Sequence, residues 1–522
     1  AVSNTGNNSA DAVMCGWLIC ILNSLAGSHD CKGGALYGNG FFTGFEGTYD
    51  LATVKGAPDQ DGQMNACRNA PYEDSTEYKE HVKKGENPYP AKHIFHPLFP
   101  GYTAGNAAEM MVAMANKDPY PAKALFNWRS NVLFSASSID HRIKDVLADP
   151  KQLPLFVGID AFINETNMYA DYIIPDRVMY EEYACDRTWG NYNQCVTAGV
   201  PVVTPRTVKN AKGAHVSMET FLVDCALAMK LPGFGKGAIP VKGGKPADLF
   251  TYDDWAVRYL SNAAEQFKGL PEVTDEDRRF AGLERAMKMV RPLLKPAEAA
   301  RVEALLSRGG YYEADSRYAG EFMKNGGGKF LQFFNPAMPA VRHCFSGKPY
   351  PGVPVAEEAR FFSGEAWRQR WSRKDYPLLF SSFKPILRSN YSVAFEHCTE
   401  ISPENFVHMH RVTAQKFGLK NGDKVRIASP NGVDVKGVLM VDEAVTPGAV
   451  CVAHAYGHTA YGAENRVVDG KTVPGIAARA GGTAVNQMIP RDPTRPGRYG
   501  MLNDYWAACN CRTGIPVKVV KA

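Results

Sequence analysis

The chain has 522 residues, 45% of them hydrophobic, so it can hold several domains with large cores. Its 59 basic and 54 acidic residues leave a formal net charge of +5, which is too small and too dispersed to indicate nucleic acid as a partner. Such a charge suits a small anionic substrate, or simply an ordinary soluble surface. The best candidate for a membrane span, 13–22, is far shorter than the roughly 20 apolar residues that a bilayer requires.

The twelve cysteines do not form a recognisable metal site. Cys15, Cys20 and Cys31 lie close together, and one residue separates Cys509 from Cys511. None of these spacings matches the Cys-x2-Cys pairs of zinc sites or the cysteine runs that ligate iron–sulfur clusters. We therefore expect most of the thiols to act as small buried apolar groups, with disulfides as an open alternative, and we predict no metal ligands in this chain.

The first part of the chain predicts one helix followed by irregular structure. An apolar segment from Asp11 to about Leu25 indicates a helix, which the glycines after it end. Residues 36–122 are rich in Gly, Pro, Tyr and Asn, so we expect loops that wrap over a larger body. The chain starts at Ala1 and shows no signal sequence, which predicts that a leader was removed or that a longer chain precedes it.

A strand, a helix and a second strand are predicted next. The strands are Ala124–Trp128 and Leu153–Ile159, and the second is apolar enough to be buried on both faces. Between them, Ser138 stands at the N-cap position of an amphipathic helix. A right-handed crossover brings the loops after both strands, 129–131 and 162–167, to the carboxyl edge of a parallel sheet. Open α/β sheets bind ligands at this edge.

Three helices are predicted between this sheet and the C-terminal region. The first, His215–Met229, carries one apolar side, which consists of Met218, Phe221, Leu222, Cys225 and Met229. The Gly- and Pro-rich residues 231–248 then indicate a linker or surface loop. Thr274 caps the second helix, whose buried stripe is predicted to be Phe280, Leu283, Met287 and Val290. Prolines separate it from a third helix, which ends at Gly309.

From Tyr376 the sequence changes to short β segments separated by turn signals such as Asn421-Gly422 and Asn431-Gly432. A short helix, Thr413–Phe417, ends at Gly418. Six strands are expected, at Leu378–Phe383, Phe406–Met409, Val425–Ser429, Val433–Val441, Ala449–His454 and Val517–Val520. Their number and spacing predict a compact β-barrel.

Three segments resemble one protein family, in the order in which that family has them. They are LNSLAGSHDCKGG at 22–34, LPLFVGIDAFINETNMYADYIIPD at 153–176 and ENFVHMHRVTAQKFGLKNGDKVRIASPNG at 404–432. With them the chain resembles the molybdopterin oxidoreductases of the DMSO reductase superfamily. The resemblance implies an α/β fold: a parallel-sheet Rossmann-like body with helical and loop-rich insertions over 1–375, then a double-psi-type β-barrel that binds the cofactor dinucleotide over 376–522.

Two further segments narrow the resemblance. SMETFLVDCALAMKLPGFG at 217–235 and VCVAHAYGHTAYGA at 450–463 look like the branch that holds the catalytic subunit of tetrathionate reductase. The chain departs from many members at 181–195, where it reads EEYACDRTWGNYNQC, so substrate rules are not carried over from formate or nitrate enzymes. Only the C-terminal half of the family's length is matched. A fragment, or one piece of a split subunit, is therefore expected.

The implied function is the two-electron reduction of a small sulfur oxyanion, tetrathionate to thiosulfate, by a periplasmic respiratory enzyme. The implied cofactor is bis(molybdopterin guanine dinucleotide) with molybdenum, and an iron–sulfur cluster is expected only in the absent N-terminal half, as is the metal's protein ligand. The expected partners are an iron–sulfur electron-transfer subunit together with a membrane anchor subunit, without nucleic acid. Reduction of arsenate or of polysulfide/thiosulfate is one alternative, and a non-catalytic cofactor-binding or assembly module is another.

By this resemblance, five residues on the loops of the sheet's carboxyl edge are predicted to bind the cofactor: Arg129, Asn131, Asp160, Glu165 and Thr166. Carboxylates suit the N–H donors of guanine and the hydroxyls of ribose, so Asp160, or Glu165 with Thr166, is expected at one of these groups. The alternative is that Asp160 and Thr166 only cap their turn. Arg129 and Asn131 would meet a diphosphate, although Arg129 as a solvated surface charge is an equal alternative.

The resemblance also implies cofactor contacts from six residues of the barrel: Ser382, Lys384, His454, Gly457, His458 and Asn486. Lys384 would lie near a phosphate or pterin, against the alternative of a surface lysine. The two histidines flank a glycine that permits close backbone approach, against the alternative of structural histidines. The amide of Asn486 can both donate to and accept from the cofactor. Separately, Arg177, Arg187 and His215 could help to attract an oxyanion.

Overall fold

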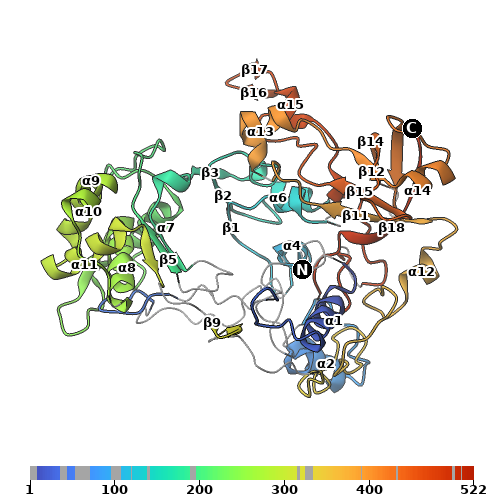
Figure 1. Cartoon of the computed structure of the whole chain (residues 1–522), viewed down its shortest axis with the longest axis horizontal. Coiled ribbons are helices and arrows are strands. Elements are labelled where there is room, and N and C mark those ends of the chain that lie inside the picture. Colours follow the sequence, from blue (N-terminus) through green and yellow to red (C-terminus); the bar gives the residue numbers. More distant parts are fainter. Residues whose placement is uncertain are drawn as a thin grey trace.

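The structure is a computed structural model of the chain. It describes residues 9–35, 44–52, 71–95, 107–118, 120–137, 142–187, 195–267, 269–313, 318–323, 333–389, 391–430, 433–495, 500–506 and 508–522. Figure 1 shows a small central sheet between a helical lobe, formed within residues 181–313, and a barrel drawn in orange and red. The helices from the start of the chain, in blue, lie below the barrel in this view.

The central sheet has three parallel strands: Leu125–Trp128 (β1), Phe156–Asp160 (β2) and Tyr172–Pro175 (β3), with β2 in the middle. Arg142–Ala148 (α6) separates β1 from β2 in the chain, which confirms the predicted strand–helix–strand order. All of β2 is buried, as its apolar sequence predicts. The parallel sheet is therefore confirmed for these strands, whereas a wider Rossmann-like arrangement stays a prediction. The predicted cap Ser138 lies outside the described residues.

A glycine in β2 positions the loop that follows this strand. A Cβ on Gly158 would lie 2.7 Å from the Cβ of Asn167, which opens the short helical turn Asn167–Tyr169 (η3). Real Cβ atoms do not approach so closely, so glycine lets this turn pack directly onto the strand. Asn167 in turn accepts a hydrogen bond from the Asn164 amide at 2.7 Å and donates one to the Phe162 carbonyl at 2.9 Å. The loop after β2 is thus held tightly against the sheet.

The region predicted as irregular loops contains helices. Ala12–Leu25 (α1) forms as predicted, but Tyr72–Asp74 (η2), Thr76–Lys83 (α2) and Ala107–Ala115 (α4) were not predicted. Ser75 caps α2 by accepting from the Tyr78 amide at 3.1 Å. Met111, Val112 and Met114 of α4 are buried in one cluster with Ile143 and Leu147 of α6, so packing against another helix stabilises this short segment.

A buried ion pair fastens α4 to the C-terminal region. Glu109 Oε2 accepts from Arg495 Nη1 at 3.0 Å, and both side chains are almost fully buried. Burial alone would raise the pKa of Glu109, but Arg495 and His93 lower it to about 2. The pair is therefore charged at every ordinary pH, in a place where neither group can be hydrated.

The helical lobe packs its helices around one core in which Val257, Leu260, Val290, Val302 and Leu305 are fully buried. Its helices are Met218–Ala228 (α7), Tyr252–Gln266 (α8), Asp275–Phe280 (α9), Leu283–Val290 (α10) and Pro296–Ser307 (α11). An antiparallel sheet of Ala184–Arg187 (β4), Cys195–Gly199 (β5) and Gly310–Tyr312 (β8) lines the same core. The three predicted helices correspond to α7, to α9 together with α10, and to α11, with Thr274 as the cap of α9.

Four details of the lobe correct the predictions. Residues 231–248 are not simply a linker, because Gly235–Ile239 (β6) pairs with Ala247–Leu249 (β7) as a hairpin. Helix α8 was not predicted, although Thr251 and Asp254 form its capping box. Phe280 is 80% exposed, because α9 ends there and Gly282, at φ +59°, turns the chain before α10. The buried residues of α7 are Thr220, Val223 and Ala226, whereas the predicted apolar side leaves Leu222 and Met229 exposed.

The six predicted strands of the C-terminal region are all confirmed, and they close into a barrel. Around it they run Leu378–Phe383 (β11), Ala449–Ala453 (β15), Val407–Met409 (β12), Asp434–Val441 (β14), Lys424–Ala428 (β13) and Thr513–Lys521 (β18). The predicted short helix is Arg411–Lys416 (α14). Strands β11 and β15 are parallel, as are β12 and β14, and the remaining neighbours are antiparallel.

Side chains from outside the strands complete the barrel core. Phe361, Trp367 and Trp371 are buried in the same cluster as Phe380 and Ile427 of the strands. Trp367 opens the short helix Trp367–Arg370 (α12). The segment before residue 376 thus packs onto the barrel, and the predicted domain boundary at this residue stays a prediction.

The remaining elements are short. They are Val132–Ser135 (α5), Met179–Glu181 (η4), Arg291–Leu293 (η5), Tyr318–Ala319 (β9), Phe322–Met323 (β10), Ser392–Ala394 (η6), Glu396–Ile401 (α13), Arg466–Val468 (β16), Lys471–Val473 (β17), Ala477–Ala480 (α15) and Val485–Met488 (η7). Among the described residues, no helix has both the length and the apolar character that a membrane span needs. Cys185, Cys344 and Cys511 are buried, as expected for thiols that act as small apolar groups.

Candidate functional site

Predicted residues of the sheet edge and of the barrel meet at one place, which we call the junction cluster: Asn131, Glu165, Thr166, His458 and Asn486. Glu165 follows β2 and lies at its centre. Its Oε1 accepts from His458 Nδ1 at 3.0 Å and from the amides of Thr459 and Ala460 at 2.9 and 3.0 Å. Its Oε2 accepts from Asn131 Nδ2 at 2.6 Å. Glu165 therefore ties a barrel loop to the sheet.

These hydrogen bonds determine the charge of Glu165. Burial alone would raise the pKa of this carboxyl, but the bonds from His458, Ala460 and Asn131 lower it to about 2. The group is thus a carboxylate at neutral pH. The His458 ring stacks on Phe134, with centroids 3.8 Å apart, and its Nε2 is buried without a hydrogen-bond partner among the described residues.

Thr166 organises the loop after β1. Its hydroxyl accepts from the Leu133 amide at 3.0 Å and donates to Asn131 Oδ1 at 3.1 Å. Both Thr166 and Asn131 are buried. The hydroxyl therefore fixes the start of α5 and orients the Asn131 amide toward Glu165.

Asp160 ends β2 and is also buried. It accepts from the Phe162 amide at 3.2 Å and from Asn164 Nδ2 at 2.9 Å, so it does cap the turn. Burial raises the pKa of this carboxyl. The hydroxyl of Tyr391, close enough for Asp160 to raise its pKa, is buried and has no hydrogen-bond partner in the described part of the chain. A contact of Asp160 with guanine or ribose stays a prediction.

Asn486 makes the second tie between barrel and sheet. It lies in η7 and donates from Nδ2 to the carbonyls of Phe134 and Ser135 at 3.1 and 3.0 Å. Its Oδ1 is buried and has no hydrogen-bond partner among the described residues. One end of this amide is thus used by the protein, and the other end is left for a donor that the described chain does not supply.

The other barrel residues lie around His454. Its Nδ1 is buried without a partner in the described ranges, and burial together with Arg512 and Lys384 lowers the pKa of this histidine to about 4. The imidazole is therefore neutral at pH 7. Lys384 is exposed, as expected from the alternative that it is a surface lysine, although its positive charge helps to lower the pKa of His454. Ser382 is buried, and its amide donates to the Arg512 carbonyl at 3.3 Å.

Two glycines let the histidine loop approach the loop before η7. Gly457 has φ +71°, and a Cβ on it would lie 2.6 Å from the amide nitrogen of Ala484. Gly482 has φ +79°, and its Cβ would lie 2.6 Å from Asn405 Oδ1. Both the backbone angle and the space therefore require glycine, because the backbone at Gly457 lies close to another barrel loop. The predicted approach of Gly457 to the cofactor stays a prediction.

The structure does not bring Arg129 into the junction cluster. Its Nε donates to Asp176 Oδ2 at 2.8 Å, and its Nη2 bonds to Glu182 and to the Arg177 carbonyl. This arginine is thus neither a simply solvated charge nor an open guanidinium, and its contact with a diphosphate stays a prediction. Of the three residues that were expected to attract an oxyanion, Arg177 and His215 are in contact, because Arg177 Nη2 donates to the His215 carbonyl at 2.9 Å. Arg187 bonds elsewhere, to Gln266.

Sequence reasoning missed one residue, Arg388. It is 1% exposed, and all of its guanidinium nitrogens lack a hydrogen-bond partner among the described residues. Its guanidinium carbon lies 4.6 Å from the ring centroid of Tyr456, a residue between His454 and His458. Burial lowers the pKa of Arg388. The sequence did contain one signal for Arg388: it lies on the loop after the first barrel strand. On this loop Lys384 was predicted as the cofactor contact instead.

Comparison with known proteins places these residues in a family. The family model described as "Molydopterin dinucleotide binding domain" matches residues 380–496. The chain is 32% identical over 525 residues to a tetrathionate reductase subunit of Salmonella typhimurium, covering 99% of this chain and 51% of the relative.

Two further relatives agree with this placement. A tetrathionate reductase subunit of Archaeoglobus fulgidus is 31% identical over 85% of this chain and 41% of its own length. A selenate reductase subunit of Mesobacillus selenatarsenatis is 25% identical over 78% of this chain and 41% of its own length. The chain therefore spans about half the length, or less, of these relatives.

The orphaned polar atoms of the site fit a molybdopterin dinucleotide. Leaving a buried polar group without a partner costs about 1–3 kcal/mol, so four such groups on neighbouring loops indicate a polar ligand. The guanidinium of Arg388 suits phosphate or carbonyl oxygens, and the imidazoles and the Asn486 amide suit the mixed donors and acceptors of pterin and guanine. The cofactor is thus a molybdopterin dinucleotide with molybdenum. The chain belongs to the molybdopterin oxidoreductases of the DMSO reductase superfamily.

Proposed function

We propose that the chain is the C-terminal portion of a respiratory reductase that reduces tetrathionate to thiosulfate. The observation that carries the proposal is a set of buried polar atoms on His454, His458, Asn486 and Arg388 that have no hydrogen-bond partner among the described residues, at a glycine-lined approach of two barrel loops. The names of the two tetrathionate reductase relatives support the choice of substrate.

The reaction needs two electrons and no other reactant: they cleave the central S–S bond of tetrathionate, and two thiosulfate ions leave. The bound cofactor supplies this redox chemistry. The protein residues bind and orient it. Asn486 and the histidines would contact heteroatoms of the dinucleotide, and Arg388 would neutralise part of its negative charge. Glu165, Asn131 and Thr166 hold the loops in place and need not touch the cofactor.

The proposal extends to the rest of the enzyme. Electrons would arrive through an iron–sulfur cluster in the half of the protein that the chain does not span, and from an iron–sulfur partner subunit with a membrane anchor. The periplasm is the proposed location. Copurification of the native protein with its partners, followed by iron and sulfide analysis, tests this extension; a catalytic subunit without any iron would contradict it.

The test of function starts from the native protein. Molybdenum and pterin are quantified first, and oxidation of a reduced viologen dye is then followed with tetrathionate, selenate, arsenate and thiosulfate in parallel. Molybdenum with two pterins and turnover on tetrathionate is the expected result. Absence of both metal and pterin would contradict the enzyme and leave the module alternative.

A second candidate substrate is selenate. The observation that favours it is the relative named as a selenate reductase, whose similarity extends over 78% of this chain. Both substrates are oxyanions, and the described residues that face the junction offer no feature that accepts one and rejects the other. Turnover on selenate without turnover on tetrathionate would establish this second candidate in place of the first.

A further inference from the structure

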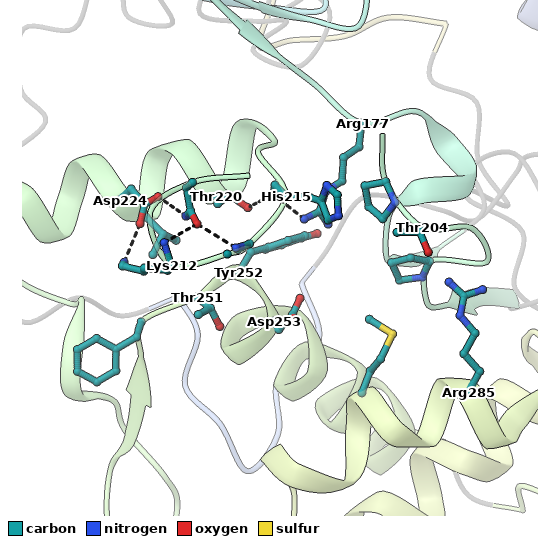
Figure 2. Close-up of a pocket in the computed structure, with 18 residues that line it drawn as sticks. Arg177, Thr204, Lys212, His215, Thr220, Asp224, Thr251, Tyr252, Asp253 and Arg285 are labelled. Atoms are coloured by element: carbon teal, nitrogen blue, oxygen red, sulfur yellow. Dashed lines mark hydrogen bonds and ion pairs between the residues drawn. The ribbon is translucent and has the colours of Figure 1, made fainter. Parts of the chain in front are cut away.

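A pocket of about 250 Å³ lies where the helical lobe meets the end of β3. It is enclosed by the segment 201–215, the start of α8, one side of α7 and one side of α10. Figure 2 shows the side chains that line it, with Tyr252 in the middle and Arg177, Thr204 and Arg285 on one side. No part of the junction cluster lines this pocket.

Two arginines line the pocket without a salt bridge to any carboxylate of the described residues. Arg177 is 7% exposed; its Nη2 donates to the His215 carbonyl at 2.9 Å, and its Nε is buried with no hydrogen-bond partner in the described residues. Arg285, on α10, bonds to the Val202 carbonyl. Neither guanidinium makes an ion pair within the described part of the chain. Each therefore carries a positive charge that is not held in a salt bridge by those residues.

The acidic residues of the pocket are already engaged. Asp224 accepts from Lys212 Nζ and from Asn210 Nδ2, both at 2.7 Å. Asp253 accepts from the Tyr183 hydroxyl at 3.0 Å. With histidine counted as neutral, the three cationic side chains of the lining, Arg177, Lys212 and Arg285, outnumber its two carboxylates, Asp224 and Asp253, by one.

Neutral hydrogen-bond donors accompany these charges. Burial raises the pKa of Tyr252, so its phenol keeps its proton, and Figure 2 shows its hydroxyl end pointing toward Arg177 and His215. Thr204 adds a second hydroxyl between the arginines in the same view. Guanidinium and hydroxyl donors around a small polar cavity are the groups that bind an oxyanion.

Two consecutive residues, Asp176 and Arg177, link the carboxyl edge of the central sheet to the pocket. Asp176 is bonded to Arg129 at that edge and to the Met218 amide at the start of α7. The next residue, Arg177, lines the pocket, and its carbonyl accepts from Arg129 Nη2 at 2.6 Å. Arg177, the proposed anion ligand, is therefore the chain neighbour of a residue that is bonded at the edge where the sheet presents its loops.

We propose that this pocket binds a small divalent oxyanion between Arg177 and Arg285, with Tyr252 and Thr204 as further donors. That the natural anion is a sulfur oxyanion, held as incoming substrate or leaving product, rests on the proposed function. Binding of the anion itself does not. Sulfate and phosphate share the required chemistry, so they serve as separate arms of the test.

The test is calorimetric titration of the native, cofactor-containing protein with sodium thiosulfate, sodium sulfate and sodium phosphate, each at the same ionic strength. The variants are Arg285→Gln, Arg177→Gln and Arg177→Lys. Lys288→Gln is the matched control, because Lys288 lies on the same helix as Arg285, carries the same charge and does not line the pocket. Melting curves verify that every variant is folded.

We expect one divalent anion per chain, with an affinity at least about tenfold weaker in Arg285→Gln and Arg177→Gln and unchanged in Lys288→Gln. Arg177→Lys should retain part of the affinity, since it keeps the charge but not the planar fork of donors. The preferred anion among the three identifies the source of the ligand.

Equal affinity in the wild type, Arg285→Gln and Arg177→Gln would overturn the proposal, as would absence of binding at millimolar anion. The outcome is separable from that of the proposed function. A protein without molybdenum or turnover whose anion binding still depends on Arg285 would refute the reductase and retain the pocket. Turnover with anion binding insensitive to both arginines would do the reverse.

Discussion

Glu165 and His458 are 293 residues apart in the chain, yet Glu165 Oε1 and His458 Nδ1 are 3.0 Å apart in the fold. Glu165→Gln should destabilise the protein, because both carboxylate oxygens of Glu165 accept hydrogen bonds. The substitution replaces one of these oxygens with an NH2 group, which cannot accept from the donor that it meets. The expected loss is about 3 kcal/mol at pH 7, the value that corresponds to a pKa lowered to about 2. Urea unfolding measures it, with the exposed Glu284→Gln as control.

The same pair predicts a pH dependence. Since folding lowers the pKa of Glu165, its contribution is complete above the ordinary carboxyl pKa and is lost as the pH falls toward 2. The difference in unfolding free energy between wild type and Glu165→Gln should therefore shrink from pH 5 to pH 2 and stay constant from pH 5 to pH 8. A difference that does not change with pH in the acid range would show that the carboxylate is not the stabilising species.

Gly457→Ala should disrupt the approach of the two barrel loops. The new Cβ would lie 2.6 Å from the Ala484 nitrogen, on a backbone with positive φ, so the loop must move. The matched control is Gly448→Ala, which has φ +86° but open space around its Cβ. We expect a loss of about 1 kcal/mol for the control, from backbone strain alone, and a clearly larger one for Gly457→Ala together with a lower pterin content. Equal losses would contradict a tight approach.

Arg388→Met should act in opposite directions on stability and on cofactor content. Without cofactor, the arginine is a buried charge with no hydrogen-bond partner among the described residues, and an apolar side chain of similar length removes the cost of burying that charge while it can still pack on the Tyr456 ring. The cofactor-free variant should therefore be at least as stable as the cofactor-free wild type, while the purified protein contains less molybdopterin. Arg411→Met, at an exposed arginine paired with Glu443, should change neither quantity. A destabilised cofactor-free variant would assign Arg388 a purely structural role.

The buried pair of Glu109 and Arg495 predicts a large effect of a small change. Glu109→Gln leaves the Arg495 charge buried without its counterion, at a cost of about 3–5 kcal/mol. Replacing both residues with apolar ones of similar size should restore much of this loss. Melting temperatures of the single and double variants measure the coupling; additive losses would show that the two side chains act independently.

Elements that depend on residues close together in the chain were predicted correctly, whereas elements that depend on contacts between distant segments were not. All six barrel strands were predicted, because alternating side chains and Asn-Gly turns are local signals. Helix α4 was missed, since its stability comes from packing on α6, and the buried face of α7 was misjudged because its neighbours decide which side is covered. The residues of the junction cluster were named by resemblance, but the bonds that bring them together, such as that from Asn486 to the Phe134 carbonyl, join distant segments and leave no trace in a local pattern.

The position of β18 has a consequence for the order of events during synthesis. This strand follows every other barrel strand in the chain, and it pairs with β11 on one side and β13 on the other, so the barrel closes only when it is in place. A ribosome must therefore have released residues 513–521 before the barrel can close. Until then, the loops that carry His454, His458 and Asn486 extend from a barrel that is still open. Loading of the cofactor should accordingly follow the synthesis and docking of this last barrel strand.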